Sequence, residues 1–105
     1  MSLLFYDSYF NDDISNWDVS SVTTMEKMFK FAESFDQDLS GWDVSNVVYM
    51  KEMFYYATDF NQDISSWNVS NVYTMYQMFY SADSFNGDIS DWDISSVTSM
   101  NYMFN

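Results

Sequence analysis

Four aspartates recur with a fixed 25-residue period, at Asp13, Asp38, Asp63 and Asp88. If the copies stack, their carboxylates lie about 5 Å apart and repel by roughly 1 kcal/mol per contact even in water. Two arrangements offset this repulsion. Each carboxylate can accept backbone N–H groups in an Asx-type turn, with Ser15, Ser40, Ser65 and Ser90 as neighbours. Alternatively, Ca²⁺ can be held between the copies by these carboxylates together with Asp12, Asp36 and loop carbonyls.

The turn interpretation is favoured over calcium, and neither leads to catalysis. Calcium needs six to eight oxygen ligands, and the chain, with only two glycines, lacks the glycine-dense loops of calcium-binding β-rolls. Glycoside hydrolysis needs two carboxyl groups in different environments, whereas these four are equivalent. The absence of Cys and His removes thiolate nucleophiles and the commonest general base and metal ligand. We therefore expect no catalytic residue, no enzyme activity and no cofactor.

A second column with the same period consists of Trp17, Trp42, Trp67 and Trp92. Such a column can act as a stacking platform for sugar rings. A large residue at the same place in every copy is, however, what a repeating interior requires. We therefore predict that the tryptophans belong to the core.

Tyrosines are the residues that differ most between copies, and they indicate contact with a partner. Tyr73, Tyr76 and Tyr80 follow an i, i+3, i+7 spacing opposite Met75 and Met78, so we expect them to face solvent. Tyrosine combines a large contact area with few rotors and a polar tip, which suits recognition surfaces. The alternative is that these rings pack between copies. The predicted partner-binding residues are Tyr49, Tyr55, Tyr56, Tyr73, Tyr76, Tyr80 and Tyr102.

The elements that position these residues come from an internal repeat. Shifting the sequence by one period aligns Phe10, Phe35, Phe60 and Phe85 without a gap. A fixed period of this size is typical of stacked supersecondary units. We predict a single domain over residues 1–105 with coils 10–34, 35–59, 60–84 and 85–105, the last incomplete, preceded by a partial coil at 1–9.

Each copy contains two periodicities. Val72, Met75, Met78, Phe79 and Ala82 recur at helical spacing, which predicts one short helix per copy. In the other half, residues 63–65 and 68–70 place β-branched residues between polar ones, which predicts very short strands. Equivalent strands of successive coils would pair in parallel. The predicted fold class is therefore an α/β repeat, a solenoid with one short helix and one or two very short parallel strands per 25-residue coil.

The chain resembles a known repeat family through segments such as FNQDISSWNVS, which begins at Phe60, and NVYTMYQMFYSA, which begins at Asn71. This pattern is similar to the mycoplasma lipoprotein repeat, which is also common in BspA-like leucine-rich-repeat surface proteins. The resemblance covers the chain from Phe10 to Phe104. It implies a leucine-rich-repeat-like architecture, an extracellular or cell-surface location, and adhesion or protein binding without catalysis.

Composition excludes several classes of partner. Three Lys and no Arg oppose sixteen acidic residues, for a formal charge of -13, so a nucleic-acid backbone would be repelled. No apolar run approaches the ~20 residues of a membrane-spanning helix, so we expect no membrane insertion. The start, MSLLFYDSYF, lacks a basic region and an apolar core, so we expect no signal peptide in this chain.

The ends provide a second candidate surface. Residues 1–4 share the repeat phase of residues 101–104, so the period would continue from one chain into the next. Apolar residues at both ends, namely Leu3, Leu4, Phe5, Met103 and Phe104, are the predicted end-to-end contact. The leading interpretation is a non-catalytic, surface-displayed module that binds protein or mediates adhesion through its Tyr-rich face. The alternative is a structural protein that stacks on itself, head to tail, into a filament.

Overall fold

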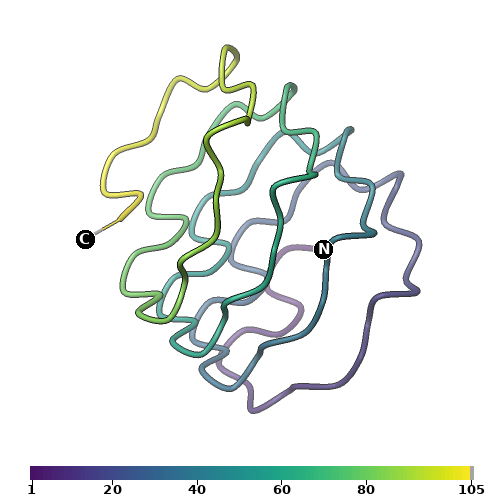
Figure 1. Cartoon of the computed structure of the whole chain (residues 1–105), viewed down its shortest axis with the longest axis vertical. Helices are drawn as coiled ribbons and strands as arrows, with labels where there is room; N and C mark the ends of the chain where they lie inside the picture. Colours follow the sequence, from purple (N-terminus) through teal and green to yellow (C-terminus); the bar gives the residue numbers. More distant parts are fainter. Residues whose placement is uncertain (105) are drawn as a thin grey trace.

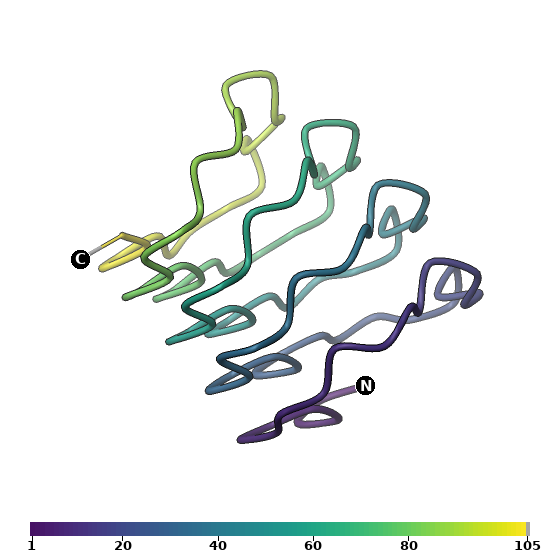
Figure 2. The same ribbon diagram turned by 60° about the horizontal axis from the view of Figure 1, so that its bottom comes forward.

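Successive copies of the repeat run side by side in the computed structural model, which describes residues 1–104 (Figures 1 and 2). Each copy traces one coil, and segments that are one repeat period apart lie next to each other along the stack. The Cα trace measures 33 × 31 × 23 Å. The N-terminal and C-terminal coils form opposite ends of this stack, as Figure 2 shows.

The predicted α/β, leucine-rich-repeat-like solenoid is wrong, because residues 1–104 contain no helix and no strand beyond isolated bridges. These parallel bridges join Thr24 to Tyr49, Tyr49 to Thr74, and Thr74 to Ser99. The predicted strand segments 63–65 and 68–70 form turns and irregular backbone instead, and the segment after Val72 forms a run of turns. The fold is thus a globule of stacked, turn-rich coils with an aromatic interior.

Hydrogen bonds explain why the segment with helical spacing is not a helix. The N–H groups of Met78 and Tyr80 bond to carbonyls three residues back, those of Met75 and Gln77. The N–H groups of Met75 and Gln77 themselves point to the next coil and bond to the carbonyls of Ser99 and Asn101. An α-helix would direct all of these donors to carbonyls four residues back. Turns that advance three residues bury the same side chains as a helix, so the predicted burial of Val72, Met75, Met78, Phe79 and Ala82 is confirmed.

The backbone conformation also excludes a helix at these positions. Within residues 1–104, nine non-glycine residues have positive φ, and they recur at two places per coil: Leu3, Asp7, Lys27, Phe31, Glu52, Tyr56, Gln77, Ser81 and Tyr102. Left-handed backbone costs an L-residue roughly 1–2 kcal/mol. Neither glycine adopts positive φ. Hydrogen bonds to the next coil, such as those from the N–H groups of Lys27 and Gln77 to the carbonyls of Lys51 and Asn101, hold most of these residues in a conformation that their local sequence does not favour.

Stacked aromatic rings fill the interior, and the prediction that the Trp column belongs to the core is confirmed for three of its four members. Phe54 lies between Phe29 and Phe79, with ring centroids 5.4 and 5.5 Å away. The indole N–H groups of Trp42, Trp67 and Trp92 donate to the carbonyls of Ile14, Leu39 and Ile64 on the preceding coil. Trp17 is 41% exposed, because the partial first coil has no segment to cover it.

The first coil is one residue shorter than the others between Asp7 and Phe10. Phe5 stacks on Phe29, whereas Phe10 stacks on Phe35, so the interval between stacked rings is one residue smaller in the first pair. The backbone shows the same shortening. The N–H of Leu3 donates to the carbonyl of Glu26, which is one residue closer in sequence than the partner in the equivalent bonds between later coils. The predicted phase of residues 1–4 is therefore shifted by one residue: Phe5 corresponds to Phe104, which stacks on Phe79 in the same manner.

Candidate functional site

The seven predicted partner-binding tyrosines fall into three groups according to their ring contacts. Tyr49 contacts Tyr73 edge to face, with centroids 6.5 Å apart. Tyr76 contacts Tyr102 at 6.3 Å in the same way. The third group contains Tyr55, Tyr56 and Tyr80, with centroid distances of 4.9 to 6.0 Å. Tyr49, Tyr56, Tyr73 and Tyr102 are exposed, whereas Tyr55, Tyr76 and Tyr80 are half-buried.

The third group extends through two further rings into a ring cluster made of Tyr6, Phe31, Tyr55, Tyr56 and Tyr80. Phe31 lies 5.6 Å from both Tyr55 and Tyr56, and Tyr6 lies 5.9 Å from Phe31. The cluster therefore crosses four successive copies of the repeat. A continuous strip of partly exposed aromatic rings is unusual on a protein surface and is typical of recognition sites.

A largely buried ion pair fixes one side of the ring cluster. Lys30 pairs with the carboxylate of Glu52, and this is the only salt bridge in residues 1–104. The Lys30 Nζ lies 4.5 Å from the centre of the Tyr55 ring and 5.5 Å from that of Phe31, within cation–π distance. Burial, with a contribution from Tyr56, raises the pKa of Tyr55 above its ordinary value. The Tyr55 hydroxyl is therefore a neutral hydrogen-bonding group at physiological pH.

Sequence reasoning missed three residues of this surface: Tyr6, Lys30 and Phe31. The repeat register contained the signal, because Lys30 occupies the position of Tyr55 and Tyr80, and Phe31 that of Tyr56. Tyr6 corresponds to Lys30 only after the one-residue shortening of the first coil is included.

The predicted Asx-type turns of the Asp column are confirmed. The N–H groups of Ser15, Ser40, Ser65 and Ser90 donate to the carboxylates of Asp13, Asp38, Asp63 and Asp88 at 2.8 to 2.9 Å. A second column repeats the motif at Asp18, Asp43 and Asp93, and Asn68 takes the remaining place with its amide oxygen. Asn68 shows that this turn does not require a negative charge.

These turns make stability depend on pH. Hydrogen bonds from the following serine lower the pKa of Asp13, Asp18, Asp38, Asp43, Asp63, Asp88 and Asp93 below the usual 3.8. A lowered pKa in the folded state stabilises the fold above the unfolded value, and this contribution disappears as pH falls through the folded values. We therefore expect the Tm to fall once the pH drops below about 4, although protonation also relieves the repulsion of the acidic surface.

Thermal unfolding from pH 6 to pH 3 measures this effect, followed by circular dichroism at intervals of about half a unit. Replacing Asp13, Asp38, Asp63 and Asp88 together by Asn should leave the fold intact, as Asn68 does naturally, and should flatten the acid limb. Superimposable profiles for the two proteins would contradict the assignment.

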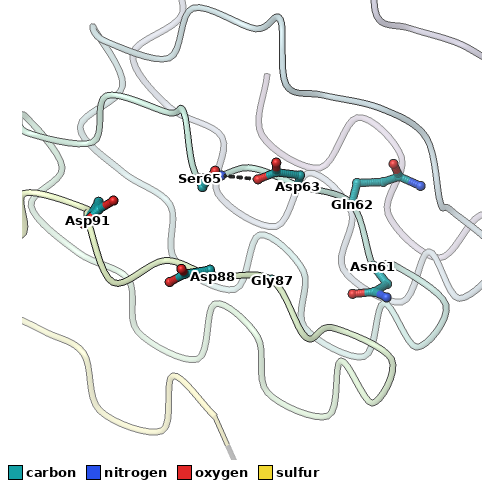
Figure 3. A pocket seen from close by; sticks show the side chains of 7 residues that line it. All are labelled: Asn61, Gln62, Asp63, Ser65, Gly87, Asp88 and Asp91. Atoms are coloured by element: carbon teal, nitrogen blue, oxygen red, sulfur yellow. Dashed lines mark hydrogen bonds between the residues drawn. The ribbon is translucent and has the colours of Figure 1, made fainter.

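A pocket of about 380 Å³ lies between the third and fourth coils and is shown in Figure 3. Its lining residues are Asn61, Gln62, Asp63, Ser65, Gly87, Asp88 and Asp91. Gly87 occupies the place of Gln37 and Gln62, whose amides each bond back to the preceding coil. Gly87 has no amide to bond back to Asn61, and the Phe85 ring lies beside it, where a Gly87 Cβ would come within 2.8 Å of that ring. The pocket is therefore a local gap in an otherwise repeated polar contact.

Two of the acidic residues that line this pocket, Asp63 and Asp88, are carboxylates that form Asx-type turns. The hydrogen bonds from their serines lower the pKa of both Asp63 and Asp88, so neither has the raised pKa of a general acid. Over residues 1–104, no three acidic, His or Cys side chains are grouped so that they could hold a metal ion. The Asp column, which was the alternative calcium site, consists of turn-forming carboxylates.

The predicted end residues differ in exposure. Leu3, Leu4 and Phe104 are exposed, Phe5 is half-buried against Phe10 and Phe29, and Met103 is buried. The backbone at the two ends is complementary. Each turn segment donates N–H groups to the coil after it, so Met100, Tyr102 and Phe104 occupy donor positions at one end. Ser2, Leu4 and Tyr6 occupy the corresponding acceptor positions at the other end.

Comparison with known proteins places the chain in a family. A family model described as "Mycoplasma protein of unknown function, DUF285" matches residues 1–105. No curated protein and no solved structure matches the chain. Within residues 1–104, the structure has no helix with the length and apolar character needed to cross a membrane. Because the match covers every residue, the chain belongs to the mycoplasma protein family DUF285.

Proposed function

We propose that this chain is a non-catalytic interaction module that binds a protein partner through the ring cluster. The observation that carries the proposal is the continuous contact of Tyr6, Phe31, Tyr55, Tyr56 and Tyr80 across four copies. Stacked coils hold these rings rigidly, so little conformational entropy is lost when a partner binds. The proposal includes an extracellular or cell-surface location, which the resemblance to BspA-like surface proteins implies.

Selection from a displayed random-peptide library tests the ring cluster even though the partner is unidentified. Binders are selected on the wild-type chain, and their affinities are measured for a Tyr56→Ser/Tyr80→Ser variant. We expect the selected peptides to bind this variant at least ~10-fold more weakly, because hot-spot aromatics contribute more than about 1.4 kcal/mol.

Tyr102→Ser is the matched control, since Tyr102 is 64% exposed but lies outside the ring cluster. It should change the affinities by less than about twofold. Selected peptides that bind the wild type and the Tyr56→Ser/Tyr80→Ser variant equally would refute the proposal.

The end surfaces support a second candidate function, head-to-tail association of copies of this chain. The supporting observation is the direction of the hydrogen bonds between turn segments. Each turn segment donates to the next coil, so the turn segment at one end of the stack has donor positions and the turn segment at the other end has acceptor positions. A contact of this kind is heterologous and propagates into a filament unless it closes. Such association raises the mass of the protein in solution as its concentration rises.

A further inference from the structure

A second, smaller pocket of about 50 Å³ lies at the end of the ring cluster. Its lining residues are Asp7, Ser8, Tyr9, Phe31 and Glu33. Phe31 is a member of the ring cluster, and Tyr6, next to Asp7 in sequence, contacts Phe31. Two acidic residues and two aromatic residues therefore line one small cavity that adjoins the proposed binding surface.

This pocket occurs where the repeat is shortened by one residue, between Asp7 and Phe10. In later coils the same connection is closed by bonds between coils, from Asp59 N–H to the Glu33 carbonyl and from Ser84 N–H to the Thr58 carbonyl. Residues 1–104 have no corresponding bond from Ser34 to the first coil. The Ser8 hydroxyl instead accepts the N–H of Phe10. The pocket is thus a local departure from the repeat.

The chemistry of the lining favours a cation. The acidic residues Asp7 and Glu33 attract positive charge, and Phe31, which already lies within cation–π distance of Lys30, is an aromatic neighbour suited to a cation. The chain already uses this pairing, because Lys30 lies over Tyr55 and Phe31 and Lys51 lies over Tyr76. Two of its three lysines are placed in this way. The formal charge of -13 draws a basic partner toward the surface.

The size of the pocket limits what can enter it. At about 50 Å³, the pocket is far smaller than the roughly 300–1,000 Å³ of sites for small organic ligands, so it suits the tip of one side chain. We propose that this pocket binds the ammonium or guanidinium tip of a Lys or Arg side chain on a protein partner that docks on the ring cluster. This inference rests on the proposed function and names the chemistry of the partner.

An NMR titration of the ¹⁵N-labelled chain tests the inference directly. The probe is the peptide acetyl-Gly-Lys-Gly-Lys-Gly-amide, and its ε-N-acetylated counterpart lacks the two charges. We expect shifts at the amides of Asp7, Tyr9, Phe31 and Glu33 with the charged peptide only. An Asp7→Asn/Glu33→Gln variant should bind it roughly 5- to 10-fold more weakly, as expected for the loss of two exposed charge pairs.

Asp63→Asn/Asp88→Asn is the matched control, because it removes the same charge elsewhere and Asn maintains the turn, as at Asn68. It should change the affinity by less than about twofold. Equal weakening in both variants, or shifts centred on the Asp column, would mean non-specific attraction and would overturn the inference. Equal binding of the acetylated peptide, or no binding by either peptide, would overturn it as well.

The library experiment separates this inference from the proposed function. Selected peptides that need Tyr56 and Tyr80 but bind the Asp7→Asn/Glu33→Gln variant at full strength would leave the interaction module standing and refute the cationic pocket. Selected peptides that lose affinity for both variants, and that contain Lys or Arg essential for binding, support both.

Discussion

Trp67→Ala should lower the free energy of unfolding by roughly 3–5 kcal/mol, the range measured for buried aromatic residues. Trp67 is 4% exposed, and its indole N–H donates to the Leu39 carbonyl at 2.9 Å. Its ring lies parallel to that of Trp92, with centroids 6.4 Å apart. Removing the side chain opens a cavity between coils and leaves the Leu39 carbonyl with the Trp42 N–H as its remaining donor. Urea denaturation followed by circular dichroism measures the loss.

Trp17→Ala is the natural control for this experiment, because the same residue at the same repeat position is 41% exposed. It should cost about 1 kcal/mol, as a partly exposed site at the end of the stack. Trp67→Phe separates the two contributions, since it retains most of the apolar area but loses the hydrogen bond, worth roughly 1 kcal/mol. Equal losses from Trp17→Ala and Trp67→Ala would contradict the burial that the structure shows.

The second large effect concerns mass in solution: we expect the 105-residue chain to associate head to tail as its concentration rises. One end exposes Leu3, Leu4 and Trp17, and the other exposes Met100 and Phe104. Apolar area buried between ends contributes about 25 cal/mol per Å² before association entropy is subtracted. The N–H positions at one end match the C=O positions at the other end, so hydrogen bonds would orient this contact head to tail. The charge of -13 opposes association, so high salt should strengthen it.

Light scattering and sedimentation across concentration, at low and high salt, measure this association. Leu4→Glu/Phe104→Glu should yield a monomer with an unchanged circular dichroism spectrum, because interior coils contact only their neighbours. Tyr49→Ser is the control at an exposed residue of an interior coil and should leave the mass distribution unchanged. A wild-type chain that stays monomeric at millimolar concentration in both salts would exclude the self-stacking function.

The repeat period and the buried positions could be read from the sequence, because they depend on residue type and spacing alone. Phe, Met and Trp columns at 25-residue intervals become the core wherever equivalent positions stack. The Asx turns were also predictable, since an aspartate and the backbone N–H two residues later meet within one short segment. The buried columns are strictly periodic and the Asx turns are local. Both can therefore be predicted without knowing the secondary structure of the segments between them.

Only the tertiary structure decided the secondary structure and the shape of the candidate site. A three-residue turn step and an α-helix bury the same residues, and the difference lies in whether N–H groups such as that of Gln77 bond within the coil or to Asn101 on the next coil. Those distant bonds also hold Tyr56 and Gln77 at positive φ, which their own sequence does not favour. The small pocket at Asp7 and Glu33 depends on a one-residue difference in register that appears only when neighbouring coils are paired. The local residue pattern does not specify a hydrogen-bond partner on the next coil, because that partner is determined by how the coils pack against each other.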